Sequence, residues 1–224
     1  MKRLELGVIF DMDGVIIDSN PYHKIAWTNF FRNNDITISE DFFQEQISGT
    51  TGDEAIASLL DRRVSDVELD TFNREIDAEF RKIISESGEL KTVPGFRKFI
   101  GDVSKANHKI ALATSAPPEN VDLVLNSLGI MKYFDLKIDK TQIVEGKPNP
   151  EIYLKTLHGL KMSKDNCIVF EDSLAGISSA TNAGLRVIGV ATSHPNHELI
   201  KAGAIVSIKD FTEISIEKLI KVLS

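Results

Sequence analysis

The chain has 224 residues, of which 42% are hydrophobic and 26% are charged, which is enough for one sizeable soluble domain or for a domain with a smaller insertion. Its net charge of −7 argues against nucleic acid or an anionic membrane as the main partner, because both bind through basic patches. No apolar stretch has the length of a membrane span or the form of a secretion signal, and Cys167 is the only cysteine, so we expect a protein of the reducing cytoplasm.

The first predicted element is a buried strand over residues 6–10, and it ends directly in two acidic residues, Asp11 and Asp13. Two carboxylates so close repel each other, which raises the pKa of at least one of them unless a cation or hydrogen-bond donors intervene. A period of two puts both on one face, and Gly14 permits a tight backbone beside them. The pattern alone is equally typical of an acidic turn. The rest of the sequence has to indicate which cation would balance the two negative charges.

The next segment, residues 17–91, contains no buried strand and is predicted to be helical throughout. Mostly apolar side chains repeat at helical spacing and define two faces. One face comprises Tyr22, Ile25, Ala26, Asn29 and Phe30, and the other comprises Leu69, Phe72, Ile76, Phe80 and Ile83. We therefore predict a helical cap domain at 17–91, inserted into a core formed by residues 1–16 and 92–224. Two linkers side by side between the domains make a hinge.

After the insertion, short apolar runs alternate with helical patterns. Strands are predicted at residues 109–114, 134–138, 167–171, 186–190 and 204–208. Helices are predicted at residues 117–128, 150–160, 174–183 and 195–202, with first-turn prolines at 118, 150 and 195. Apolar strands without polar alternation, separated by helices, indicate an α/β fold with a doubly wound parallel sheet and a Rossmann-like core. In such sheets ligands bind beyond the carboxyl ends of the strands.

Polar residues occur where these strands end. They are Asp11 and Asp13, Thr114 and Ser115, Lys147 in the loop GKPNP, and Glu171 with Asp172. Carboxylates such as Asp11, Glu171 and Asp172 are hard oxygen ligands that suit Mg²⁺. Thr114 and Lys147 are suited to bind phosphoryl oxygens. Each residue alone has an ordinary alternative, a helix cap or a solvated lysine, but their meeting at one sheet edge indicates a phosphoryl-transfer site.

The motifs FDMDG, ATS, GKPNPEIY and FEDSLAGISSA together resemble the four motifs of the haloacid dehalogenase superfamily. The segment DMDGVIIDSNPYHKIAW is similar to the beta-phosphoglucomutase-like and sugar-phosphate phosphatase branch, which carries a helical cap. The resemblance implies that Asp11 is a nucleophile forming an aspartyl-phosphate, and that Asp13 is a general acid and then a general base. It implies Mg²⁺ held by Asp11, the Asp13 carbonyl and Asp172, with Glu171 near or in the coordination shell.

The resemblance also implies which residues bind the substrate. Thr114, Lys147 and the backbone amides around Met12 and Ser115 correspond to the phosphate-binding groups. His23 resembles a residue that couples substrate binding to the general acid in the mutases, although packing beside Trp27 explains a histidine there equally well. In the cap, the segment with Gly49 and Thr50 corresponds to a substrate-contacting loop.

Hydrolysis and mutation differ in what accepts the phosphoryl group. A mutase has to hold a bisphosphate at both ends, and its pattern places an arginine shortly after the glycine that corresponds to Gly49, where this chain has Thr50. Pro117 and Pro118 also replace polar residues that the mutases use. We therefore expect a monomeric, Mg²⁺-dependent phosphatase for a small phosphorylated metabolite such as a sugar phosphate. A beta-phosphoglucomutase-type mutase is the alternative, and a non-catalytic phosphometabolite-binding module is a weaker one.

Overall fold

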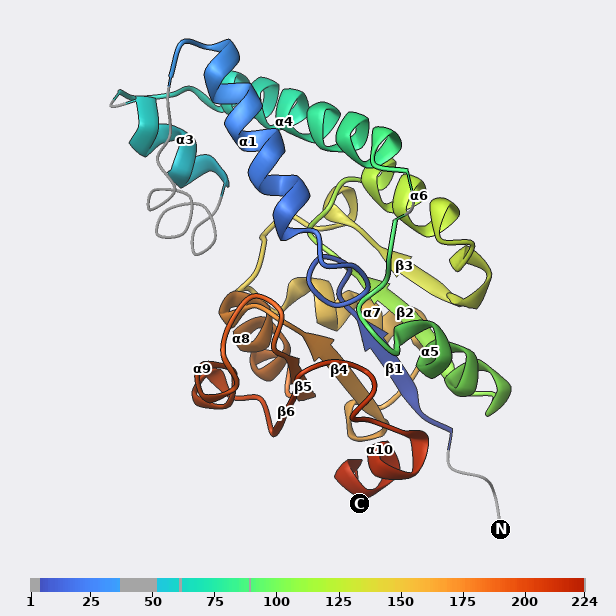
Figure 1. Cartoon of the computed structure of the whole chain (residues 1–224). Helices are drawn as coiled ribbons and strands as arrows, with labels where there is room; N and C mark the ends of the chain where they lie inside the picture. The colour runs from blue at the N-terminus through green and yellow to red at the C-terminus, as the bar shows by residue number, and fades with distance from the viewer. Residues whose placement is uncertain (1–4, 37–51, 61, 89, 224) are drawn as a thin grey trace. The chain divides into compact units, whose positions relative to one another are not determined.

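The computed structural model describes residues 5–36, 52–60, 62–88 and 90–223 (Figure 1). The chain divides into two compact units, one made of Met1–Asp18 with Leu90–Ser224 and the other of Ser19–Glu89. The assignment of residues 17–91 as a cap domain that serves the core stays a prediction.

A six-stranded parallel sheet forms the centre of the first unit (Figure 1). Its order is β3-β2-β1-β4-β5-β6. The strands are β1 (Gly7–Phe10), β2 (Lys109–Ala113), β3 (Leu136–Ile138), β4 (Cys167–Glu171), β5 (Arg186–Val190) and β6 (Val206–Ile208). The predicted doubly wound, Rossmann-like sheet is thus confirmed. The chain builds outward from β1 through β2 and β3 and then returns to β4 on the other side of β1, so the topological switch lies between β1 and its two neighbours, where such folds bind ligands.

Helices connect the strands of this sheet. They are α5 (Phe96–Lys105), α6 (Pro118–Ser127), α7 (Glu151–Leu160), α8 (Leu174–Asn182), α9 (Asn196–Ala202) and α10 (Ile216–Leu223), with short 3₁₀ turns η2 (Met131–Tyr133), η3 (Lys140–Gln142) and η4 (Lys164–Asn166). The four helices predicted here are present with ends shifted by a residue or so, and α5 and α10 are additional. Pro118 begins α6 as predicted, whereas Pro150 and Pro195 precede α7 and α9 at the N-cap position.

The two faces of the sheet carry different cores. On one face Phe10 and Phe170, paired across β1 and β4, stack with ring centroids 5.2 Å apart. Phe96, Phe99 and Phe211 surround them at centroid distances of 5.2–6.2 Å. The opposite face is aliphatic, and there α7 and α8 pack residues that include Ile152, Tyr153 and Ile177 against Ile9, Val169 and Val187. The second face matters for the site, because α7 packs there against β2 and β3 and its Tyr153 hydroxyl reaches Glu171 at the end of β4.

The second unit contains α1 (Asn20–Asn33), α3 (Gly52–Leu60) and α4 (Asp66–Glu86). Helix α4 begins with a capping box in which Ser65 and Glu68 exchange hydrogen bonds, and this fixes its first turn. On α1 the buried residues are Ala26, Trp27, Phe30 and Phe31. The prediction that Ile25 belongs to the apolar face is wrong, because Trp27 and Phe31 take that face and Ile25 is 47% exposed.

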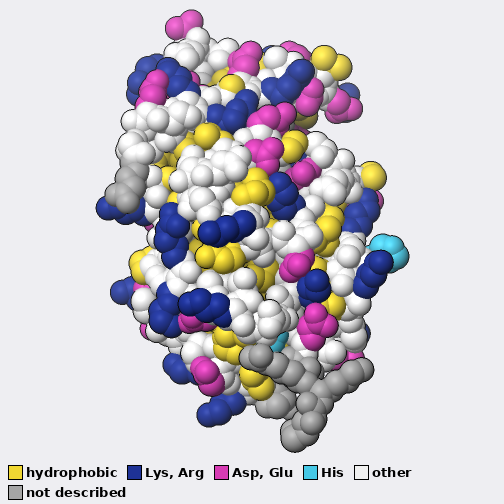
Figure 2. Space-filling model, turned by 90° about the vertical axis from the view of Figure 1, so that its right-hand side faces the viewer, with side chains coloured by type: hydrophobic (Ala, Val, Ile, Leu, Met, Phe, Trp, Pro, Cys, Tyr) yellow, Lys and Arg dark blue, Asp and Glu magenta, His cyan; other side chains and the backbone are white. Residues whose placement is uncertain are grey.

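The surface is mixed in charge. Figure 2 shows lysine and arginine side chains interspersed with aspartate and glutamate side chains on the face it displays. Within the described part of the chain, no helix is both long enough and apolar enough to cross a lipid bilayer.

Candidate active site

Three buried carboxylates meet at the carboxyl ends of β1 and β4. Asp11, Glu171 and Asp172 each offer an oxygen atom within 4.8 Å of the others. Their meeting follows from the strand register, since Phe10 pairs with Phe170 and the backbone amide of Asp11 donates to the Phe170 carbonyl at 3.1 Å. The residues that follow the two strands therefore lie side by side at the switch point of the sheet.

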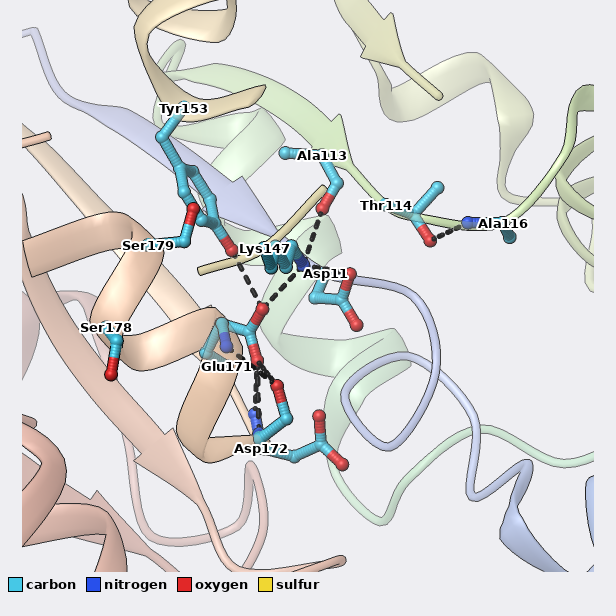
Figure 3. Close-up of polar contacts among 12 residues, drawn as sticks. Asp11, Ala113, Thr114, Ala116, Lys147, Tyr153, Glu171, Asp172, Ser178 and Ser179 are labelled. Atoms are coloured by element: carbon cyan, nitrogen blue, oxygen red, sulfur yellow. Dashed lines mark hydrogen bonds and ion pairs between the residues drawn. The ribbon is translucent and has the colours of Figure 1, made fainter. Parts of the chain in front are cut away.

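Lys147 supplies a cation to this cluster (Figure 3). Its Nζ lies 2.9 Å from Asp11 Oδ1 and 2.6 Å from Glu171 Oε1, and it donates to the Ala113 carbonyl at 3.4 Å. Burial lowers the pKa of Lys147, but the charges of Asp11 and Glu171 outweigh that effect and raise it well above its ordinary value. Lys147 therefore remains protonated in the site, as a fixed positive charge.

Neighbouring helices hold the loop that carries Lys147. From α8, Ser179 Oγ donates to the Asn149 carbonyl at 2.6 Å, and Asn182 Nδ2 donates to the Pro148 carbonyl at 3.3 Å. At the start of α7, Glu151 accepts hydrogen bonds from the amides of Val144 and Glu145 at 2.9 and 2.8 Å. The backbone around Lys147 is thus fixed independently of its side chain.

The Glu171 carboxylate is fully buried and accepts five hydrogen bonds. Oε1 accepts from Lys147 Nζ and from the Tyr153 hydroxyl at 2.9 Å. Oε2 accepts from the amides of Asp172 and Ser173 at 3.0 and 3.1 Å and from the Ser173 hydroxyl at 3.0 Å. The contact of Tyr153 has no signal in the sequence, because a tyrosine among the apolar residues of a helix does not indicate that its hydroxyl meets a carboxylate.

Burial makes the ionised form of the cluster costly. It raises the pKa of Asp11 from 3.8 to about 7, with further increases from the charges of Glu171 and Asp13, although Lys147 opposes them. Burial also raises the pKa of Asp172 well above its usual range, and the charges of Glu171 and Asp11 add to the shift. The repulsion between neighbouring carboxylates that the sequence predicts is therefore present. Three carboxylates against one lysine leave an excess of negative charge, which a divalent cation with a preference for oxygen ligands would balance.

The loop after β1 fits closely against Asp172. Gly14 has a φ of +70°, and a Cβ atom there would lie 1.8 Å from Asp172 Oδ2, so a side chain has no room. The hydroxyl of Ser193, beyond β5, donates to the same Oδ2. Thr192 Oγ1 donates to the Gly14 carbonyl at 2.6 Å. Asp172 is thus oriented from two sides, and its carboxylate together with that of Asp11 could hold a metal ion such as Mg²⁺.

The remaining predicted core residues lie at or near this edge. Thr114 is buried at the end of β2, and its hydroxyl oxygen accepts a hydrogen bond from the Ala116 amide at 3.1 Å (Figure 3). Met12 is buried, and its carbonyl accepts from the Ile16 amide at 2.8 Å. Asp13 is half-buried, and Ser115 is exposed. Among the described residues, the group of carboxylates within ligand distance of one another does not include Asp13, which leaves its backbone carbonyl as the expected metal donor.

The predicted cap residues lie either in the second unit or outside the described residues. His23 lies in the second unit, where its ring stacks on Phe80 with centroids 4.3 Å apart and planes 12° from parallel. The His23 ring thus packs on Phe80 of α4, and its role toward substrate stays a prediction. Gly49 and Thr50 lie outside the described residues.

Comparisons with known proteins agree with the fold and the motifs. A family model described as haloacid dehalogenase-like hydrolase matches residues 8–190. A phosphorylated carbohydrates phosphatase of Thermotoga maritima is 34% identical over 205 residues, which are 91% of this chain and 94% of that protein. A beta-phosphoglucomutase of Bacillus subtilis is 29% identical over 218 residues, 95% of this chain and 93% of that protein. The crystal structure of a HAD hydrolase, family IA, variant 3, from Entamoeba histolytica has a TM-score of 0.90 at 30% identity, covering 97% of this chain and 99% of that one.

Proposed function

This chain belongs to the haloacid dehalogenase-like hydrolases, and on that premise we propose that it is a magnesium-dependent phosphatase acting on a small phosphorylated metabolite, a sugar phosphate. The observation that carries the proposal is the buried cluster of Asp11, Lys147 and Asp172 at the switch point of the sheet. The name of the Thermotoga maritima relative, a phosphorylated carbohydrates phosphatase, supports the substrate class.

In the first half of the proposed reaction, an oxygen of Asp11 attacks the phosphorus atom of the ester. The new bond joins this carboxylate oxygen to phosphorus, and the bond from phosphorus to the alcohol oxygen breaks. Asp13 gives its proton to that departing oxygen. Lys147, already 2.9 Å from Asp11 Oδ1, neutralises charge on the phosphoryl oxygens, and the Thr114 hydroxyl donates to one of them.

In the second half, water displaces Asp11 from phosphorus. Asp13, now a carboxylate, takes a proton from the water as the new bond to phosphorus forms. The bond between phosphorus and the Asp11 oxygen breaks, which releases inorganic phosphate and restores both carboxyl groups to their starting states. The raised pKa of Asp11 means that a nearby cation has to keep this carboxylate ionised for attack.

The residues fit Mg²⁺ as that cation. Asp11, Asp172 and the Asp13 carbonyl would hold it, and the bound ion supplies positive charge for the Asp11 carboxylate and the phosphoryl oxygens. The preference for oxygen ligands and the excess of buried negative charge support this choice over softer metals.

A phosphosugar mutase is the second candidate, favoured by the 29% identity to the Bacillus subtilis beta-phosphoglucomutase over 95% of the chain. Against it, Pro117 and Pro118 stand at the N-terminus of α6, where a mutase has polar side chains, and neither proline carries a side-chain donor. Water is therefore the acceptor that the residues around the site favour.

The direct test is a screen for phosphate release from sugar phosphates with Mg²⁺, run beside an isomerisation assay on beta-glucose 1-phosphate primed with the bisphosphate. Phosphate release without isomerisation supports the phosphatase, and the reverse result supports the mutase. Inactivity in both assays would reject both candidates and would favour a non-catalytic module that binds a phosphorylated metabolite.

The nucleophile is tested with Asp11→Asn, which keeps the size of the side chain but removes its nucleophilic oxygen. We expect turnover to fall by at least about a thousandfold with the fold intact. Asp122→Asn, the same change on the exposed surface of α6, is the matched control and should leave turnover unchanged. Comparable turnover in the two variants would contradict the assignment of Asp11.

A further inference from the structure

Tyr153 reaches the active site from beneath the sheet edge. It lies on α7, is fully buried, and points its hydroxyl at Glu171 Oε1, 2.9 Å away (Figure 3). Lys147 Nζ lies over the same ring, 5.4 Å from its centroid, close enough for a cation–π attraction. One side chain thus contacts both the lysine and the carboxylate that binds that lysine.

The hydrogen bonds of Glu171 occupy the acceptor sites of its carboxylate. An ionised carboxylate offers about four lone-pair sites, and this one already accepts five hydrogen bonds from buried or half-buried donors. The donors comprise one cation, two amides and two hydroxyl groups. A metal ion would have to displace at least one of them, and each displaced donor would be left unpaired in a buried place.

We propose that Tyr153 is a positioning residue, which fixes the Glu171 carboxylate so that Glu171 in turn holds Lys147 Nζ against Asp11. In this arrangement Glu171 serves the lysine and is not a direct metal ligand, so the metal depends on Asp11 and Asp172. The inference rests on the proposed function, because it takes Lys147 as the cation that meets the phosphoryl group.

The physical reason is that a lysine side chain is a flexible stem with a point charge at its end. The position of this charge depends on the groups that accept hydrogen bonds from the ammonium group, and two of these acceptors are carboxylates here. Without the Tyr153 hydroxyl, Glu171 Oε1 loses one of its two partners in a buried site, and its rotation is no longer fixed on that side. The charge of Lys147 would then be spread over more positions, and phosphate binding would weaken.

The test uses Tyr153→Phe, which removes one oxygen and keeps the ring under Lys147. Binding of inorganic phosphate in the presence of Mg²⁺ is measured by titration calorimetry, and KM and kcat are measured with a phosphate ester. We expect phosphate affinity to fall about tenfold and KM to rise with it. Thr156→Val is the matched control, because Thr156 lies on the same helix, is fully buried, and donates its hydroxyl to the Ile152 carbonyl away from the site.

A double-mutant cycle separates positioning from a general loss of structure. In a Lys147→Met background, Tyr153→Phe should cause no further loss of phosphate affinity, because the group through which it acts is already gone. An additive loss would overturn the inference. Should Lys147→Met fail to fold, the comparison of Tyr153→Phe with Thr156→Val decides alone, and equal phosphate affinity in those two variants would overturn it.

The claim about the metal has its own readout. Mg²⁺ affinity, measured without substrate, should fall far more in Asp172→Asn than in Glu171→Gln, and equal losses would show that Glu171 is a ligand. The proposed function fails separately: wild-type protein that neither binds phosphate nor hydrolyses any ester rejects the function and this inference together. If Tyr153→Phe binds phosphate as tightly as the wild type does, the inference alone is rejected.

Discussion

Asp11 is the residue whose environment is easiest to test by pH. Its pKa is 3.8 in an ordinary environment and about 7 in the folded protein, so the folded chain keeps a proton that the unfolded chain releases between those values. The contribution of Asp11 to stability therefore declines as pH rises from about 4 to about 7, and its full cost is present above pH 7.

We accordingly expect the melting temperature of Asp11→Asn, relative to that of the wild type, to be higher at pH 8 than at pH 5 when a chelator is present. The asparagine has no charge to bury, whereas the aspartate ionises over that interval. Thermal unfolding at the two pH values, with Asp122→Asn as the exposed control, measures the effect. A difference that is the same at both pH values would mean that the pKa of Asp11 is not raised.

Ser193 contacts Asp172, one of the proposed metal ligands. Its hydroxyl donates to Asp172 Oδ2 and so fixes how this carboxylate is turned. Groups that orient a ligand in this way commonly change metal affinity by about 10–100-fold when removed. We expect Ser193→Ala to weaken Mg²⁺ binding by about tenfold in calorimetric titration without substrate. Ser178→Ala, which removes a hydroxyl that donates to the Leu174 carbonyl within α8, should bind Mg²⁺ like the wild type.

Helix α8 shows how a whole element depends on one small residue. A Cβ atom at Gly176 would lie 1.8 Å from Glu171 Oε1, and Glu171 cannot move aside without breaking the hydrogen bonds that fix it. We expect Gly176→Ala to reduce both phosphatase activity and melting temperature. Gly101→Ala in α5 is the contrasting variant, since nothing lies within 4 Å of its Cβ position, and we expect a gain of about 0.5–1 kcal/mol in unfolding free energy.

Two glycine variants that change stability in the same direction would show that helix propensity, and not contact with Glu171, decides the outcome at Gly176. Phosphate release and thermal unfolding on the same samples distinguish the two cases.

The elements could be predicted well where periodicity is the cause of structure. Strands β4 and β5 have the predicted ends, because apolar runs bounded by turn residues are what a buried parallel strand requires. The meeting of Asp11, Lys147 and Asp172 also agrees with expectation, since it follows from parallel topology. Their catalytic roles stay predictions.

Contacts that depend on side-chain direction could not be predicted. Tyr153 and Ser193 reach the carboxylates from α7 and from the loop after β5, and no spacing in the sequence relates them to Glu171 or Asp172. The sequence pattern puts Ile25 on the buried face of α1, but the larger aromatic side chains of Trp27 and Phe31 are buried there and Ile25 is exposed.

The core of the first unit depends on residues from both ends of the chain. Phe211, just before α10, packs its ring 5.2–6.0 Å from those of Phe10, Phe96, Phe99 and Phe170. We expect Phe211→Ala to lower the free energy of unfolding by about 3–5 kcal/mol in urea or thermal denaturation, because it opens a cavity at the centre of this cluster. Val144→Ala, at a side chain that is 90% exposed, is the control, and a similar loss in both variants would contradict a core role for Phe211.

The placement of β1 between β2 and β4 has a consequence for biosynthesis. Asp11 leaves the ribosome well before its partner Lys147, which lies 136 positions later in the chain, and before Asp172, which is later still. A nascent polypeptide therefore carries an acidic loop that has neither its lysine nor its second carboxylate until β4 and Asp172 have been translated. Ion capture by this loop would accordingly follow the synthesis of β4, and products truncated before β4 would be inert toward phosphate esters.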